Sequence, residues 1–161
     1  MKKLYLMRHA TSDWPKHIQT DIERPLTSHG EVEAELMANR LKNKKAEIDL
    51  MLISKATRTQ ETSKFIIDSV SVKMSMVTKE IYETTHEHLL EVIQDLPDDV
   101  DSLMILAHNP SISMLTTVLL GTYADLPPAV LVEIDFDVES WRNIDRGSVT
   151  HEHIEVPSMF L

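Results

Sequence analysis

The chain has 161 residues, a formal net charge of −10 and no cysteine. A chain of this length buries roughly 70% of its unfolded surface, so we expect residues 1–161 to form one domain. The lack of cysteine excludes disulfides, thiolate metal sites and a cysteine nucleophile. The negative charge argues against nucleic acid and anionic membranes as partners. We find no apolar stretch long enough to span a membrane and no signal-peptide pattern, so we expect a cytoplasmic protein.

Strand and helix patterns alternate along the first 120 residues. Apolar runs predict strands over 3–7, 50–53 and 103–107, and alternating polar and apolar residues predict a partly exposed strand over 73–77. Residues 11–25 are polar and irregular and are predicted to form a loop. Helices are predicted over 27–45, with Thr27 as the N-cap, and over 55–69, 88–96 and 111–120.

The last third of the chain is predicted to be extended over 129–135, 141–144 and 149–156, with antiparallel pairing. Alternation of strands and helices is typical of an α/β protein. We therefore predict a three-layer α/β/α sandwich that has a mainly parallel central sheet and antiparallel C-terminal strands. Ligands of such sheets bind beyond the carboxyl ends of the strands.

Polar side chains follow three of the predicted strands at these carboxyl ends. They are Arg8-His9, the segment 54–58 that contains Arg58, and His108-Asn109. A neutral histidine can attack phosphorus and form a phosphohistidine intermediate, which water then hydrolyses. The transition state is stabilised by fixed cations, and the planar fork of arginine matches phosphate oxygens. The pattern therefore predicts phosphoryl transfer.

Four motifs in chain order make this prediction more specific. They are Arg8-His9-Ala10, continuing as Thr11-Ser12-Asp13-Trp14; Arg24-Pro25-Leu26-Thr27 with Gly30; Ser54, Arg58 and Thr62 at spacings of four; and Leu96-Pro97-Asp98-Asp99-Val100 before His108-Asn109-Pro110. Together they resemble the histidine phosphatase superfamily, which also contains the phosphoglycerate mutases. The match is closest to the small SixA-type phosphohistidine phosphatases, and it spans nearly the whole chain.

The resemblance implies a role for each matching residue. His9 would be the nucleophile, Arg8 and Arg58 would clamp the phosphoryl oxygens, and His108 would be a further donor. Arg24 would bind substrate, although an arginine at this position can instead pair with Asp21 or Glu23. Asn109 would lie beside the pocket and contribute through its backbone. No cofactor or metal is implied.

Many superfamily members use a glutamate to protonate the leaving oxygen, and the candidates here are Glu80 and Glu83, which can equally be surface carboxylates. An imidazole leaving group accepts a proton near neutral pH, because its unperturbed pKa is about 6.5, so it does not need this acid. The chain also lacks a long insertion that could cover a small substrate. Both points favour phosphohistidine on a partner protein. Small phosphomonoesters, or a non-catalytic phosphate-binding module, are the alternatives.

Two other histidine pairs invite a metal hypothesis. They are His86 with His88 and His151 with His153. Residues i and i+2 of a strand share a face, but the spacing implies no third ligand. We therefore interpret His151 and His153, which alternate with Val149, Ile154 and Val156, as solvent-facing. Asp13 and Trp14 are interpreted either as part of the pocket mouth or as anchors of the loop.

Overall fold

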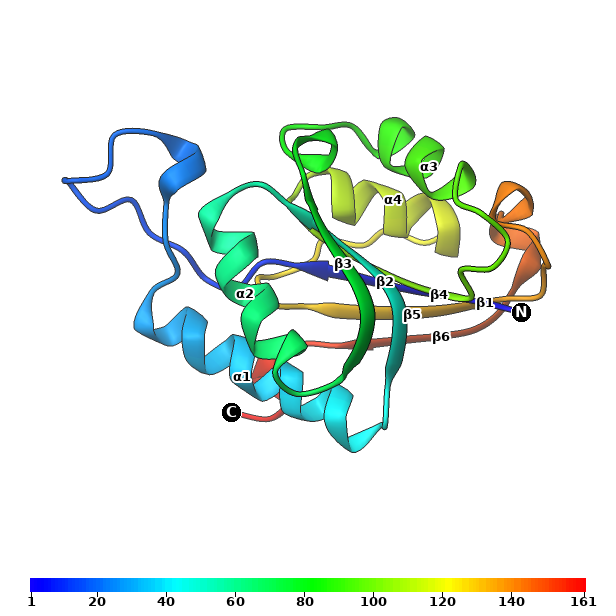
Figure 1. The fold of residues 1–161 in the computed structure, drawn as a ribbon, viewed down its shortest axis with the longest axis horizontal. Helices are drawn as coiled ribbons and strands as arrows, with labels where there is room; N and C mark the ends of the chain where they lie inside the picture. Colours follow the sequence, from blue (N-terminus) through cyan, green and yellow to red (C-terminus); the bar gives the residue numbers. More distant parts are fainter.

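A six-stranded sheet forms the centre of the computed structural model, which describes all of residues 1–161 (Figure 1). Its strands are β1 (Lys2–Arg8), β2 (Glu47–Ser54), β3 (Ser71–Thr78), β4 (Ser102–Ala107), β5 (Leu131–Phe136) and β6 (Val149–Glu155), in the order β3-β2-β4-β1-β5-β6. The first four strands pair in parallel, whereas β5 pairs antiparallel with β1, and β6 pairs antiparallel with β5. This confirms the predicted sheet.

Two helices cover each face of the sheet. α1 (Ser28–Asn43) and α2 (Thr57–Ile67) pack on one face, and α3 (His86–Gln94) and α4 (Ser111–Leu120) pack on the other (Figure 1). The predicted three-layer sandwich is therefore confirmed. None of these helices is long and apolar enough to cross a membrane.

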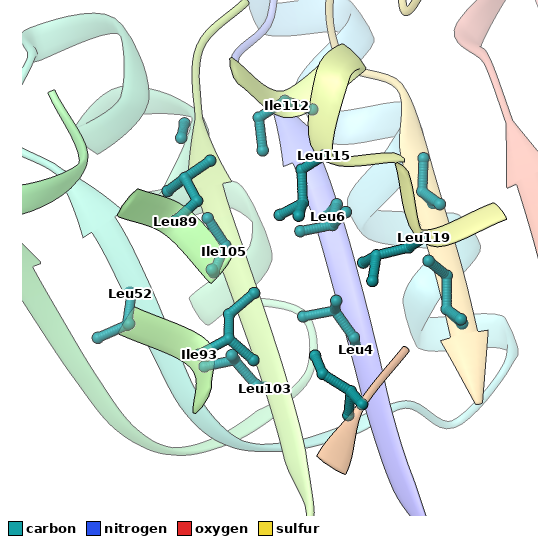
Figure 2. Packing of buried hydrophobic residues seen from close by; sticks show 14 of the residues in the cluster. Leu4, Leu6, Leu52, Leu89, Ile93, Leu103, Ile105, Ile112, Leu115 and Leu119 are labelled. Atoms are coloured by element: carbon teal, nitrogen blue, oxygen red, sulfur yellow. The ribbon is translucent and has the colours of Figure 1, made fainter. Parts of the chain in front are cut away.

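The two central strands are buried on both faces, which explains why their sequences are almost continuously apolar. Along β1, Leu4 and Leu6 face α3 and α4, whereas Tyr5 and Met7 face α1 and α2. β4 alternates in the same way. Figure 2 shows the hydrophobic cluster between the sheet and the pair α3 and α4. The helices contribute Leu89, Ile93, Ile112, Leu115 and Leu119, which pack on Leu4, Leu6, Leu103 and Ile105 of the strands.

Local signals place the start of α1 and the end of α4 where the sequence predicted them. The Thr27 hydroxyl accepts a hydrogen bond from the Gly30 amide, as an N-cap does. Gly121 ends α4 in the left-handed conformation with a φ of 74°. Gly30 is also required by close packing, because a Cβ there would lie 2.1 Å from the Thr11 carbonyl oxygen. The loop before α1 is thereby held against the first turn of the helix.

One predicted extended segment is wrong. Residues 141–144 were expected to be extended, but Trp141–Asn143 form a short 3-10 helix capped by Ser140. The Trp141 ring is fully buried in the α3–α4 layer, and its Nε1 donates to the Val100 carbonyl at 2.6 Å. The 3-10 turn directs the Trp141 ring into the core. Because the segment turns at this point, it does not form a further strand of the sheet.

A buried lysine lies at the amino end of β1. The Lys2 side chain is 2% exposed, and its ammonium group donates to the carbonyls of Asp98 and Val100 at 2.6 and 3.0 Å. A third bond, of 2.9 Å, goes to the Asp101 carboxylate. A buried ammonium is tolerated only when its donors are paired, and here all three have acceptors.

Candidate active site

The carboxyl ends of β1, β2 and β4 bring the two predicted histidines together. His9 directly follows β1, and its amide donates to the Ala107 carbonyl of β4 at 3.1 Å. His108 directly follows β4. The two imidazole rings are tilted by 58° and their centroids are 5.2 Å apart. Parallel pairing of β1 with β4 thus produces the central pair of the site.

His9 is held as a neutral imidazole with one defined tautomer. Its Nδ1 lies 2.7 Å from the Ala10 carbonyl oxygen, which can only accept, so the proton is on Nδ1 and the lone pair is on Nε2. Burial lowers the pKa of His9 to about 3; the nearby charges of His108, Arg58 and Arg8 act in the same direction, and the bond to Ala10 opposes them. An unprotonated Nε2 is the state that a nucleophilic histidine needs.

Arg58 lies beside this nitrogen. It comes from the first turn of α2, is 6% exposed, and donates from Nε to Nε2 of His9 at 3.3 Å. Its two terminal nitrogens contact Asp21, one at the backbone carbonyl (2.8 Å) and one at the carboxylate (3.1 Å). Asp21 therefore fixes the guanidinium of Arg58 with its Nε beside Nε2 of His9. In this position the guanidinium can bind a phosphoryl group at that nitrogen.

Arg8 and His108 each contain a buried polar atom that has no partner in the protein. These atoms are Arg8 Nε and His108 Nδ1. Arg8 also donates from Nη1 to the Leu126 carbonyl at 3.0 Å, and burial lowers its pKa. Burial likewise lowers the pKa of His108 to about 4. Buried polar atoms are normally paired. The two unpaired atoms of Arg8 and His108, which lie next to His9 and Arg58, are therefore typical of a binding site for a polar ligand.

Arg24 is bound within the loop that precedes α1. Its guanidinium donates to the Asp21 carboxylate at 3.0 Å, to the Ser12 hydroxyl at 3.0 Å and to the Asp13 carbonyl at 3.2 Å, and it lies 5.5 Å from the Trp14 ring centroid. The pairing with Asp21 that the sequence offered as an alternative is therefore present. Substrate binding by Arg24 stays a prediction. Asp13 and Trp14 serve as loop anchors in these contacts.

The Asn109 side chain is bound to protein on both sides. It donates to the Leu126 carbonyl at 2.9 Å and accepts from the Ser113 amide and hydroxyl at 3.2 and 2.7 Å. Asn109 therefore joins the start of α4 to the segment that also receives Arg8. Its proposed contact with substrate stays a prediction.

The two glutamates proposed as acids are both exposed. Glu80 lies 3.2 Å from Nε2 of His88, and Glu83 has a positive φ of 51°. Tyr82, which lies between them in the sequence, faces the site instead: its ring is 5.6 Å from the His108 ring in an edge-on arrangement. An acid role for either glutamate is untested, and no contact places one beside His9 or His108.

Sequence reasoning missed Asp21 and Tyr82 as members of the site. Asp21 accepts from the Tyr82 hydroxyl at 2.7 Å and also pairs with Arg24 and Arg58. Burial raises the pKa of Asp21, but the bonds from Tyr82, Arg24 and Arg58 outweigh burial and lower it to about 2. Asp21 is therefore an anion at neutral pH, and its bonds to Arg58 hold that guanidinium in place. The sequence signal for Asp21 was its position three residues before Arg24. We interpreted that spacing only as a possible ion pair for Arg24, and not as a sign that Asp21 belongs to the site.

The histidine pairs outside the site bind neighbouring carboxylates. His86 lies 3.1 Å from Glu87, and His153 lies 3.1 Å from Glu155. No group of three or more His, Asp or Glu side chains is arranged to hold a metal ion. The candidate site is therefore the cluster of His9, His108, Arg8 and Arg58, and no candidate metal centre is found elsewhere in the structure.

The chain matches known proteins in sequence and in fold. The family model of the histidine phosphatase superfamily (branch 1) matches residues 4–84. The chain is 31% identical over 120 residues to the phosphohistidine phosphatase SixA of Escherichia coli strain K12, covering 73% of each protein. It is 32% identical over 114 residues to an uncharacterised protein of Mycobacterium tuberculosis, covering 70% of this chain and 69% of that protein.

A solved structure shows the same fold over the full length. The protein histidine phosphatase SixA complexed with tungstate superimposes with a TM-score of 0.82 at 24% identity, covering 99% of both chains. The chain belongs to the histidine phosphatase superfamily. Within that family it is similar to the SixA phosphohistidine phosphatases, as the four motifs indicated.

Proposed function

We propose that the protein is a metal-independent phosphatase that acts on phosphohistidine in a partner protein through a phosphoenzyme on His9. The observation that carries the proposal is the contact between Arg58 Nε and His9 Nε2, since it places a fixed cation at the lone pair of a neutral imidazole. In this mechanism the guanidinium exchanges its bond to Nε2 for a bond to the incoming phosphoryl oxygen.

The proposed reaction has two steps. In the first, the Nε2 lone pair of His9 attacks phosphorus while the phosphorus–nitrogen bond of the substrate breaks. The electron pair stays on the substrate imidazole, which leaves as a neutral ring because its other nitrogen carries a proton. In the second, water attacks the phosphoryl group, the bond to Nε2 breaks, and inorganic phosphate is released. Arg8, Arg58 and His108 would stabilise the equatorial oxygens in both steps.

Two features support phosphohistidine over a small phosphomonoester. The residue of the Glu80–Glu83 segment that faces the site is Tyr82, and its hydroxyl donates to Asp21. Burial, together with this bond, raises the pKa of Tyr82. A tyrosine in this state is a poor acid for an alkoxide leaving group. In addition, none of the five cavities of the structure is lined by His9, Arg58 or His108, which agrees with an open site that a side chain of another protein could enter. The similarity to SixA agrees with this choice.

The test is to trap the intermediate. The protein is incubated with a radiolabelled phosphohistidine peptide and quenched; an acid-labile, base-stable phosphoryl group should be found on His9. His9→Ala should form none, while His151→Asn, which changes an exposed histidine of β6, should label normally. Turnover without any label on His9 would overturn the mechanism. Binding of phosphate without turnover would identify a non-catalytic module, and faster hydrolysis of sugar phosphates than of the peptide would identify a phosphomonoesterase.

A further inference from the structure

Ser54 contacts the ring of His108 from the side away from its unpaired nitrogen. It is the last residue of β2 and is fully buried, and its Oγ lies 2.7 Å from Nε2 of His108. The other ring nitrogen, Nδ1, is buried and has no partner in the protein. The side chain of Ser54 is therefore hydrogen-bonded to one ring nitrogen of His108, and the other ring nitrogen is available to bind a ligand.

The direction of the bond follows from what else the hydroxyl can reach. The Oγ of Ser54 accepts from the Ala56 amide at 3.4 Å, and its only partner able to accept the hydroxyl proton is Nε2 of His108. The hydroxyl therefore donates, so Nε2 holds a lone pair and the ring proton is on Nδ1. Because burial keeps His108 neutral at pH 7, this choice of nitrogen decides whether Nδ1 can donate.

The tautomer matters because a phosphoryl oxygen is only an acceptor. With the proton on Nδ1, His108 can donate to a phosphoryl group carried by His9, whose ring lies 5.2 Å away. With the proton on Nε2, a lone pair would face the same oxygen. We propose that Ser54 is a positioning residue, whose hydroxyl holds His108 in the Nδ1–H tautomer that can donate to the phosphoryl group. The catalytic part of this inference rests on the proposed function, whereas the tautomer does not.

Nitrogen-15 NMR of the histidine rings tests the tautomer directly, because protonated and bare ring nitrogens give separate signals. The signals of His108, identified among the 8 histidines by their loss in His108→Asn, should show a protonated Nδ1 at about pH 7. In Ser54→Ala the proton should move to Nε2 or divide between the two nitrogens. A wild-type spectrum with the proton on Nε2 would overturn the inference without any variant, and so would a Ser54→Ala spectrum unchanged from wild type.

Ser111→Ala is a matched control. Ser111 is also buried, and its hydroxyl donates to the backbone carbonyl of His108 at 2.9 Å instead of the ring. Removing it should disturb packing to a similar degree but leave the tautomer unchanged. A shift of the His108 signals in Ser111→Ala equal to that in Ser54→Ala would show a general packing effect and would count against Ser54.

Kinetics then test the consequence of the tautomer. Ser54→Ala should lower kcat on a phosphohistidine peptide about tenfold, the size of one hydrogen bond, with a smaller change in KM. Ser54→Thr, which keeps the hydroxyl, should restore both kcat and the spectrum towards wild type. If wild-type protein forms no phosphoenzyme on His9, the proposed function fails and the spectra still decide the tautomer. If His9 is phosphorylated normally but Ser54→Ala leaves kcat and the spectrum unchanged, only the role of Ser54 fails.

Discussion

His9, Arg58 and His108 are far apart in the chain, yet their meeting could be predicted because each follows a strand or begins a helix at the same edge of the sheet. Asp21 could not be found in this way. It lies 37 residues from Arg58 and 61 from Tyr82, and it reaches both from a three-residue 3-10 helix, Asp21–Glu23, within a segment that no sequence periodicity predicts. The residues on regular elements were therefore predictable, and the anion that holds Arg58 was not.

Substitution of Arg58 should remove most of the activity. Arg58→Ala should lower kcat/KM on a phosphohistidine peptide by about 10²–10³-fold, because one fixed cation at the transferring group is lost. Arg58→Lys should recover only part of this loss, since an ammonium cannot replace the planar fork. Arg142→Ala, which changes an exposed arginine, is the control in steady-state assays. Near-normal kinetics in Arg58→Ala would remove Arg58 from the proposed site.

Glu80 should be dispensable. Its carboxylate is 60% exposed and contacts His88, so Glu80→Gln should change kcat on a phosphohistidine peptide by less than about twofold, within the range usual for surface substitutions. The measurement is steady-state hydrolysis of that peptide beside a sugar phosphate. A large loss on either substrate would identify Glu80 as the acid that the structure does not place at the histidines.

At the scale of elements, the predictions succeeded where local signals decide the outcome. Thr27 caps α1, Gly121 ends α4, and the apolar runs of β1 and β4 form the doubly buried centre of the sheet. The prediction for residues 141–144 failed because a distant contact decides that segment. Trp141 bonds to Val100, 41 residues earlier, and a pattern of neighbouring residues contains no information on such a partner.

Gly30 is predicted to couple α1 to the loop that carries Asp21 and Arg24. In Gly30→Ala the new methyl group would meet the Thr11 carbonyl, so the free energy of unfolding should fall by about 1–3 kcal/mol, as overpacking does. Gly147→Ala is the matched control, because the nearest atom to its new Cβ would lie at an ordinary 3.5 Å. Urea unfolding of both variants gives the comparison. Equal stability of the two variants would show that the loop moves aside without cost.

The whole molecule should lose stability on mild acidification. Burial lowers the pKa of His9 to about 3 and of His108 to about 4, whereas an unfolded histidine titrates near 6.5. As the pH falls below about 6.5, the unfolded chain binds protons that the folded chain does not, so the free energy of unfolding falls until about pH 4 for His108 and about pH 3 for His9. Each histidine contributes a slope of at most about 1.4 kcal/mol per pH unit.

Urea unfolding at several pH values between about 7 and 4.5 measures this slope. His108→Asn should reduce it, while His151→Asn, an exposed histidine on β6, should leave it unchanged. A free energy of unfolding that stays constant through this range, or rises on acidification, would show that His9 and His108 are not buried in the neutral form. Asp21, whose pKa is lowered to about 2, should add a further loss only at more acidic pH.

The buried ammonium of Lys2 has a consequence at the other end of β1. A strand advances about 3.3 Å per residue, and a slip of one residue also turns every side chain to the opposite face. Such a slip would withdraw Lys2 from its three acceptors and carry His9 away from Arg58. The alignment of His9, the proposed nucleophile, therefore also depends on a lysine roughly 23 Å away, seven residues earlier in the strand.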